Sequence, residues 1–332
     1  MLDLRKFYIN GHWCEPAAAN DQPVINPATE RAIATISLGT AVDVDRAVAA
    51  ARKAFDGFGY SSLEQRVALL ERLLEVYMDR YEEMAEAISQ EMGAPIDFAR
   101  NNQAACGSGH IRAAIAALKE YEFEKQLATG RVVKEPIGVC GFITPWNWPI
   151  NQVACKTAPA LATGCTVVLK GSELSPLSSH LFTDMIDQAG YPSGVFNLVD
   201  GLGPEVGAAI SSHPDIDMVS FTGSTAAGIA VSKAAADNVK RVALELGGKS
   251  PNIILDHDGF ADAVRSGVSS CFRNSGQSCN APTRMLVPRS RYDEALQIAR
   301  AVTLETGVGD PRDSGRHIGP VVSSSHYARI QD

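Results

Sequence analysis

The sequence predicts an α/β protein built on a parallel β-sheet. Apolar runs of strand length alternate with segments of helical periodicity between residues 137 and 246, an order that is typical of parallel strands joined by helices. Glycine-rich or charged turns follow directly after several of these runs. The chain has 332 residues, of which 45% are hydrophobic and 20% are charged, which is the composition of a soluble globular protein with room for two domains.

Charge and cysteine content exclude several classes of function. The net charge of −8 gives no electrostatic footprint for nucleic acid or an anionic membrane. The seven cysteines are odd in number and form no C-x-x-C pair, so we expect neither a disulfide framework nor a zinc site. No secretory leader and no apolar run long enough to span a membrane is visible. We therefore expect a cytoplasmic protein that binds a small molecule.

The N-terminal part of the chain predicts a hairpin, a short strand and three helices. Asn10-Gly11 is a strong two-residue turn signal between the apolar runs of residues 7–13. A short strand is expected over residues 32–37 and an exposed hairpin arm over residues 122–136. Apolar residues at helical spacing predict the helices 43–55, 63–92 and 97–121.

Strands and helices then alternate, and the loops after the strands are candidates for binding a ligand. The strands are predicted at 137–143, 166–170, 195–199, 216–222 and 242–246, and the helices between them at 176–189, 203–212 and 224–238. Ligands of such sheets bind at the carboxyl ends of the strands. Lys170 and Glu173 offer a cation and a carboxylate suited to ribose hydroxyls. Ser224 opens a helix whose N-terminal N–H groups suit a pyrophosphate.

Cys279 is the candidate nucleophile. It follows a Ser-Gly-Gln turn at the end of an amphipathic helix, residues 260–272, and it precedes a short apolar strand. A lone cysteine is usually a small buried hydrophobe, and we interpret Cys271 in that way. Cys279 differs from Cys271 because its neighbours Gln277, Ser278 and Asn280 are polar.

Two further stretches supply candidate catalytic groups. Glu245 lies between two leucines and before two glycines; apolar surroundings raise the pKa of a carboxyl toward that of a general base. The alternative for Glu245 is a surface charge at a strand end. Asn147 lies between Trp146 and Trp148 in a loop bracketed by prolines, where its amide can face a developing oxyanion. The alternative for Asn147 is a turn residue in an aromatic packing corner.

Together these stretches resemble the aldehyde dehydrogenase superfamily. The resemblance rests on Leu-Glu-Leu-Gly-Gly-Lys at 244–249 with Gly-Gln-x-Cys ending 34 positions after the glutamate, on Thr-Pro-Trp-Asn-x-Pro at 144–149 and on Phe-Thr-Gly-Ser at 221–224. It implies that Cys279 is the nucleophile and Glu245 the general base. Asn147 and the Cys279 backbone N–H then form the oxyanion hole.

The resemblance also implies a nicotinamide cofactor. NAD is favoured by Glu173, which opposes the 2′-phosphate of NADP, although NADP remains possible in the family. The residues that the resemblance assigns to the cofactor are Thr144, Trp146, Lys170, Glu173, Gly203, Thr222, Gly223, Ser224 and Leu246.

The implied organisation is a Rossmann-type dinucleotide-binding domain, residues 1–247, with a protruding oligomerisation arm, followed by the N-terminal part of an α/β catalytic domain, residues 248–332. Family members are longer, and their Glu-x-Phe-Gly-Pro stretch is absent from this sequence, so we expect a C-terminally truncated chain. The family forms homo-dimers or tetramers, in which the arm pairs with a final strand that this sequence lacks.

The implied reaction oxidises an aldehyde to a carboxylic acid. Gln-Ser-Cys-Asn-Ala-Pro-Thr at 277–283 resembles a branch that acts on semialdehydes or aromatic aldehydes. Two alternatives stay open. One is a truncated, inactive homologue that at most binds NAD, and the other is a cysteine hydrolase that uses Cys279 with a histidine.

Overall fold

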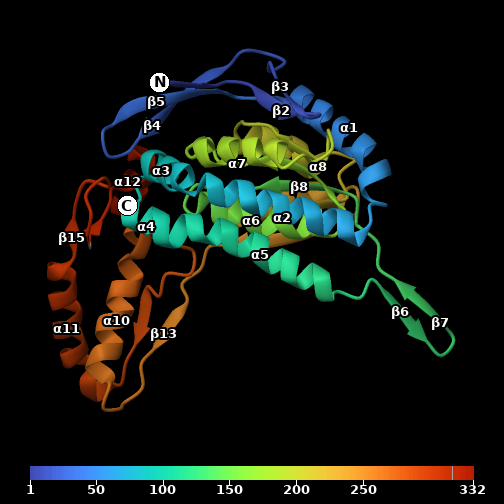
Figure 1. Ribbon diagram of the computed structural model, residues 1–332. Helices are drawn as coiled ribbons and strands as arrows, with labels where there is room; N and C mark the ends of the chain where they lie inside the picture. The colour runs from blue at the N-terminus through green and yellow to red at the C-terminus, as the bar shows by residue number, and fades with distance from the viewer. Residues whose placement is uncertain (316) are drawn as a thin grey trace.

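A seven-stranded sheet forms the centre of the molecule in the computed structural model, which describes residues 1–315 and 317–332 (Figure 1). The strand order is β12-β11-β8-β9-β10-β2-β3. Strands β8 to β12 are parallel to one another, whereas β2 and β3 are antiparallel additions at one edge. The predicted parallel α/β sheet is therefore confirmed. The seven strands are β2 (Phe7–Ile9), β3 (His12–Cys14), β8 (Val139–Ile143), β9 (Thr166–Lys170), β10 (Phe196–Leu198), β11 (Met218–Gly223) and β12 (Arg241–Leu246).

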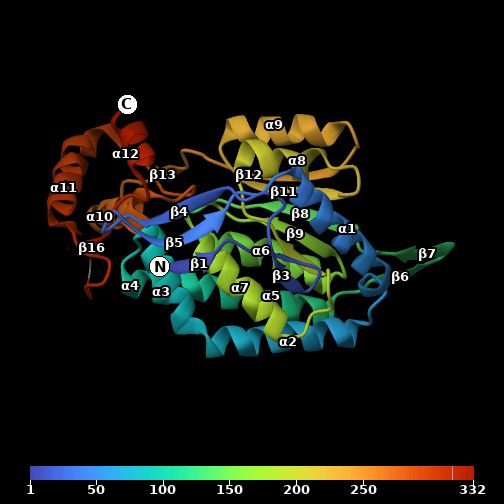
Figure 2. The same ribbon diagram turned by 90° about the horizontal axis from the view of Figure 1, so that it is seen from above.

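Helices cover both faces of this sheet because its parallel strands are apolar on both faces. Along β9, Val167 and Leu169 pack into the core on one face, and Val168 packs into the core on the other. In Figure 2, α8 and α9 lie on the opposite side of the sheet from α2. The first face is covered by α2 (Leu63–Asp79), α5 (Ala105–Glu120), α6 (Pro149–Ala162) and α7 (Pro176–Gln188), and the second by α1 (Ala41–Phe58), α8 (Ala208–Ser212) and α9 (Thr225–Ala236).

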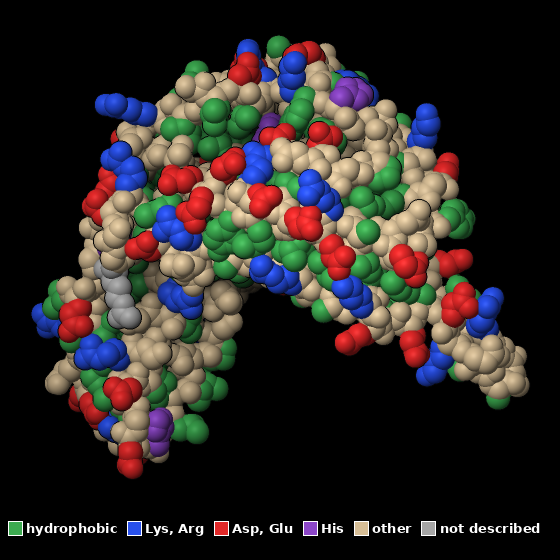
Figure 3. Space-filling view, in the orientation of Figure 1, with side chains coloured by type: hydrophobic (Ala, Val, Ile, Leu, Met, Phe, Trp, Pro, Cys, Tyr) green, Lys and Arg blue, Asp and Glu red, His purple; other side chains and the backbone are tan. Residues whose placement is uncertain are grey.

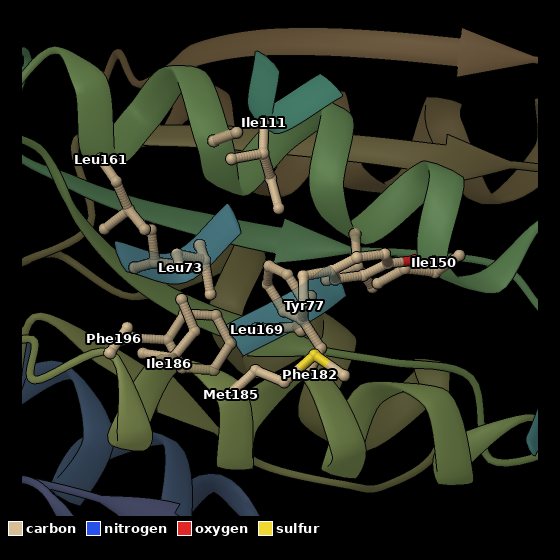
Figure 4. Packing of buried hydrophobic residues seen from close by; sticks show 14 of the residues in the cluster. Leu73, Tyr77, Ile111, Ile150, Leu161, Leu169, Phe182, Met185, Ile186 and Phe196 are labelled. Atoms are coloured by element: carbon tan, nitrogen blue, oxygen red, sulfur yellow. The ribbon is translucent and has the colours of Figure 1, made fainter. Parts of the chain in front are cut away.

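The larger core lies on the first face (Figure 4). There, side chains of four helices meet the sheet, and the Tyr77 hydroxyl is satisfied by a hydrogen bond to the Ala104 carbonyl oxygen at 2.7 Å. The residues labelled in Figure 4 are Leu73, Tyr77, Ile111, Ile150, Leu161, Leu169, Phe182, Met185, Ile186 and Phe196. This core fixes α6, which begins directly after the loop of Asn147.

The N-terminal hairpin agrees with its prediction, since Asn10 and Gly11 both have positive φ between β2 and β3. The predicted strand 32–37 is β5 (Arg31–Ser37). It pairs with β1 (Leu2–Leu4) and β4 (Asp21–Asn26) in a small separate sheet.

The single helix predicted over residues 63–92 is wrong. The chain forms α2 and α3 (Tyr81–Met92), and Arg80 between them has φ −108° and ψ 20°. The apolar spacing gives no sign of this break. Tyr77, Met84 and Ile88 are all buried and keep one helical stripe across it.

The helix predicted over residues 97–121 is also divided. It comprises α4 (Ile96–Phe98), the π-helical segment η1 (Ala99–Ala104) and α5. The Tyr77 and Tyr81 hydroxyls donate to the carbonyl oxygens of Ala104 and Arg100. These bonds satisfy backbone groups near the π turns, where the regular ladder is interrupted.

The C-terminal residues form a lobe with a small core of its own around Ile254, Phe260, Val264 and Ala295. In Figure 1 this lobe and the hairpin β6–β7 project from the central sheet at well-separated places, and Figure 3 shows a hollow between them. The hairpin consists of β6 (Glu124–Leu127) and β7 (Gly130–Val133), and the short segment η2 (Gly203–Gly207) lies between β10 and α8. The elements of the lobe are β13 (Pro251–Ile253), α10 (Phe260–Phe272), η3 (Arg273–Gly276), β14 (Arg284–Leu286), η4 (Arg289–Arg291), α11 (Tyr292–Glu305), β15 (Gly307–Val308), β16 (His317–Ile318) and α12 (Ser324–Gln331). Within the described part of the chain, no helix combines the length and apolarity that crossing a membrane requires.

Candidate active site

Cys279 follows a sharply turned segment. After α10, three consecutive residues, Asn274, Ser275 and Gly276, have φ values of 55°, 57° and 74°. The left-handed region is unfavourable for residues other than glycine by roughly 1–2 kcal/mol each, and asparagine tolerates it best. The strained turn reverses the chain and leaves the Cys279 side chain exposed, so that its sulfur is accessible to a ligand.

Asn147 lies against the nucleophile loop. Its Nδ2 donates to the Gln277 carbonyl oxygen at 2.9 Å, and the neighbouring Trp148 Nε1 donates to Ser278 Oγ at 2.8 Å. The structure therefore brings two sequence-predicted residues, Asn147 and Cys279, onto adjoining loops. An amide has two N–H groups, so the second one is available to a substrate oxygen.

A buried amide network of Gln103 and Asn274, which was not predicted, holds this turn in place. Gln103, on the π-helical segment, donates to Asn274 Oδ1 at 2.8 Å. Asn274 Nδ2 in turn donates to the backbone oxygens of Asn147 and Gln277, at 2.8 and 3.1 Å. Gln103 is predicted as part of an ordinary helix, and Asn274 was not singled out; the tolerance of asparagine for positive φ is the signal that could have pointed to it.

Glu245 lies in a cleft of about 520 Å³ beside α6, together with Asn151, Cys155 and Lys156. The apolar environment expected for Glu245 is not found, because its side chain is exposed. The physical reason is strand alternation: Leu244 and Leu246 on β12 pack toward the second core, which turns the residue between them to the opposite face.

Lys156 is a charged neighbour of Glu245 that sequence reasoning missed. Its Nζ donates to Ser220 Oγ at 2.9 Å. Burial lowers the pKa of Lys156, and the nearby Cys155 and Glu245 oppose that shift. A lysine inside the apolar run of α6 is the signal that could have drawn attention to it. The arrangement places a carboxylate and a cation together on one wall of the cleft.

The nine residues expected to hold a cofactor lie at the carboxyl ends of β8 to β12 or within five residues after them. Strand β8 has β9 on one side and β11 on the other, so the chain winds outward from β8 in two directions. A doubly wound sheet binds its ligand at such a switch point. The nine are Thr144, Trp146, Lys170, Glu173, Gly203, Thr222, Gly223, Ser224 and Leu246.

Several contacts at this edge are already made within the protein. Lys170 Nζ and Glu173 Oε2 form an ion pair at 2.8 Å, with Lys170 almost fully buried. Ser224 caps α9 and accepts a hydrogen bond from the Ala227 N–H at 3.2 Å. His326 of α12 meets Trp146 edge-on, with ring centroids 5.0 Å apart. The sequence had not suggested His326.

The comparisons with known proteins agree with one another. The aldehyde dehydrogenase family model matches residues 13–332. The chain belongs to the aldehyde dehydrogenase family. It is 54% identical to the 3-succinoylsemialdehyde-pyridine dehydrogenase of a Pseudomonas species, over all of this chain and 70% of that relative. The resemblance inferred from the motifs is therefore confirmed.

Solved structures of aldehyde dehydrogenases share the fold. The enzyme of Bartonella henselae superposes with a TM-score of 0.98 at 53% identity, over 100% of this chain and 70% of that one. A mutant of aldehyde dehydrogenase C from Pseudomonas syringae, in complex with NAD+ and octanal, superposes with a TM-score of 0.97 at 51% identity, over 98% and 67%. This aldehyde dehydrogenase is thus an NAD(P)-dependent enzyme by family.

The residues at the switch point of this aldehyde dehydrogenase fit a dinucleotide. A Cβ on Gly228 in α9 would lie 2.7 Å from Leu246 Cδ2, so the absence of a side chain there lets the helix lie close to β12. The N-terminus of α9 then points its free N–H groups to the sheet edge, as a pyrophosphate requires. Lys170 and Glu173 offer a donor and an acceptor for ribose hydroxyls.

Proposed function

We propose that this aldehyde dehydrogenase oxidises an aldehyde to a carboxylic acid through a thioester on Cys279. The observation that carries the proposal is the hydrogen bond of Asn147 to the loop of the nucleophile. It holds an amide donor near an exposed thiol, and few other roles explain that pairing. We assign dinucleotide binding to residues 1–247 and part of the catalytic apparatus to residues 248–332.

Each residue has a definite role in this mechanism. The Cys279 thiolate attacks the carbonyl carbon of the aldehyde, and the carbonyl oxygen becomes an oxyanion. The free N–H of Asn147 and the Cys279 backbone N–H donate to that oxygen, and such a donor contributes about 3–4 kcal/mol to transition-state stabilisation. A bound nicotinamide dinucleotide supplies the acceptor of the hydride.

Glu245 completes the reaction by accepting a proton from water. The resulting hydroxide attacks the thioester carbonyl, and the acid leaves while Cys279 returns as a thiolate. Its exposed position on the wall of the cleft supports this role, because the carboxylate is accessible to water there.

For the substrate, we propose a semialdehyde or an aromatic aldehyde. The support is the name of the Pseudomonas relative, which describes a semialdehyde joined to a pyridine ring. The octanal complex of the Pseudomonas syringae protein makes a straight-chain aldehyde the natural comparison substrate.

We further propose that the chain forms a homo-dimer or tetramer, with the hairpin β6–β7 in the interface. All eight residues of its two strands are exposed, including Leu127, Val132 and Val133. Sedimentation of the chain with and without the hairpin tests this part.

The reaction is tested by mixing the purified chain with NAD and an aldehyde panel and following the absorbance of NADH. Cys279→Ala should abolish turnover. Glu245→Gln should still give a burst of about one NADH per site, followed by turnover at least ~100-fold slower, because only the later step needs the base. Turnover that survives Cys279→Ala would contradict the proposal. Ester hydrolysis that is independent of NAD would favour a cysteine hydrolase instead.

A further inference from the structure

The cleft beside α6 is lined by a second group of cysteines that the proposed reaction does not use. Cys140 is on β8, Cys155 is on α6, and Cys165 immediately precedes β9. All three are reduced. Cys140 and Cys165 are only 2% and 3% exposed, but both form part of the cleft wall, which is within reach of a small molecule.

The fold places Cys140 and Cys165 side by side. Strands β8 and β9 are parallel, with Cys140 opposite Val167. Cys165 lies two residues before Val167, and side chains two residues apart along a strand share a face. Each thiol lies close enough to the other to shift its pKa. The two side chains therefore face each other from adjacent strands on the wall of one cleft.

The surroundings of Cys165 favour a thiolate. Thr163 Oγ1 lies 3.5 Å from the Cys165 sulfur. The contact with Cys140 lowers the pKa of the Cys165 thiol to about 6, against its burial, and Thr163 and the backbone of Gly138 and Ile137 reinforce the lowering. The contact with Cys165 and burial raise the pKa of the Cys140 thiol. Cys165 is therefore the thiol of the pair that ionises first, as an attacking cysteine must, and Cys140 is the resolving one.

Arg66 provides a second indication that Cys165 can carry a negative charge. It is buried on α2, its Nε has no hydrogen-bond partner, and among residues 1–315 and 317–332 it forms no ion pair with a carboxylate. A Cβ on Gly164 would lie 3.1 Å from its Nη1, and the charge of Cys165 raises the Arg66 pKa against the lowering by burial. Buried cations require a counter-charge, and the Cys165 thiolate supplies one.

We propose that Cys165 and Cys140 form a peroxide-sensitive dithiol, separate from the nucleophile Cys279. The Cys165 thiolate attacks one oxygen of hydrogen peroxide, the O–O bond breaks, and hydroxide leaves, so that the sulfur becomes a sulfenic acid. The Cys140 sulfur then attacks this sulfur, the S–O bond breaks, and water leaves with the Cys140 proton. In sum, two thiols lose two electrons and two protons, and one peroxide becomes two waters.

The site is tested by adding hydrogen peroxide to the reduced, folded chain. Remaining thiols are then blocked with N-ethylmaleimide in urea, and the peptides are analysed by mass spectrometry. We expect the Cys140 and Cys165 peptides joined and two hydrogens lighter, and separated again by dithiothreitol. Cys140→Ser should remove the link and leave a sulfenic acid on Cys165 that dimedone labels. The link should persist in Cys279→Ala and in the control Cys271→Ser.

Three results would overturn the proposal. One is recovery of both thiols unmodified from folded protein at a peroxide dose that oxidises Cys279. Another is a link from Cys165 to Cys155 instead of Cys140, and the third is a link that forms only after the chain unfolds, as judged by circular dichroism.

Arg66 gives a separate measurement of the same site. In Arg66→Met, loss of the cation should slow the formation of the link on the order of tenfold at pH 5, below the Cys165 pKa of about 6, because one unit of thiol pKa changes the thiolate fraction about tenfold there. Arg66→Lys restores the charge and should recover most of the rate. An unchanged rate in folded Arg66→Met would exclude a role for Arg66 as the counter-ion of Cys165. The Cys140→Ser variant would still show whether Cys140 and Cys165 form the link.

Discussion

The Asn147 side chain donates to the backbone oxygen of Gln277 at 2.9 Å. This hydrogen bond joins the loop that follows β8 to the loop of the nucleophile, which comes from another part of the chain. The same contact positions the amide and limits the movement of Cys279, two residues further on. A change at Asn147 should therefore affect chemistry more than binding.

Asn147→Asp should lower kcat by about 100- to 1,000-fold, the range for losing one oxyanion donor. The carboxylate has the shape of the amide, but it repels both the Gln277 oxygen and the oxyanion. Asn238, just beyond the C-terminal end of α9, makes a similar bond to the Ser212 carbonyl oxygen at 3.1 Å. Asn238→Asp is therefore the matched control and should leave kcat unchanged. Steady-state kinetics decides, and a loss below tenfold in Asn147→Asp would rule out the donor role.

Asn274 should be sensitive to both its side chain and its backbone conformation. Asn274→Gly keeps the positive φ and loses the hydrogen bonds to Gln103, Asn147 and Gln277, whereas Asn274→Ala also incurs strain of roughly 1–2 kcal/mol. Both variants should lose turnover, and Asn274→Ala should unfold at a lower urea concentration than Asn274→Gly. Equal urea midpoints for the two variants would show that the turn is not strained.

The sequence predicted those features that local patterns determine. The alternation of strands and helices identified the parallel sheet, and Asn10-Gly11 identified the hairpin. The break at Arg80 was missed because Tyr77, Met84 and Ile88 keep a helical period across it. The predicted apolar environment of Glu245 was wrong because, in a strand, the two flanking leucines face away from the residue between them.

The contacts that assemble the site could not be predicted from the sequence. Gln103 and Asn274 are 171 positions apart, and their hydrogen bond is buried. It depends on a π-helical segment that no spacing rule reveals. Motif resemblance found Asn147 and Cys279 separately, but only the fold shows that they share a hydrogen-bonded turn.

Glu173 should set the preference between the two dinucleotides. Its carboxylate is held by Lys170 at the end of β9, where it would repel the 2′-phosphate of NADP. Glu173→Gln should raise the ratio of kcat/KM for NADP over NAD on the order of tenfold, as expected for removing one like-charge contact. Glu205→Gln, an exposed change in η2, is the control. An unchanged ratio of kcat/KM in Glu173→Gln would mean that Glu173 does not contact the ribose of the cofactor.

Glu91 should make the stability of the chain fall as pH rises through neutrality. It is fully buried on α3 and accepts hydrogen bonds from the Leu177 and Ser178 N–H groups. Burial raises its pKa from 4.5 to about 8, against the lowering by those hydrogen bonds. Between these two values the unfolded chain releases the proton while the folded chain keeps it.

The free energy of unfolding should therefore decline by up to about 5 kcal/mol between pH 4.5 and pH 8, since each unit of pKa difference is worth about 1.4 kcal/mol, and level off above pH 8. Glu91→Gln keeps an oxygen that accepts both N–H groups and carries no titratable proton, so its stability should lack this decline. Urea unfolding of both proteins at several pH values gives the difference directly. The exposed Glu86 of the same helix provides the control, because Glu86→Gln should follow the pH dependence of the unmodified chain. Parallel curves for Glu91→Gln and the unmodified chain would mean that Glu91 is ionised in the folded state, with the N-terminus of α7 compensating for its burial.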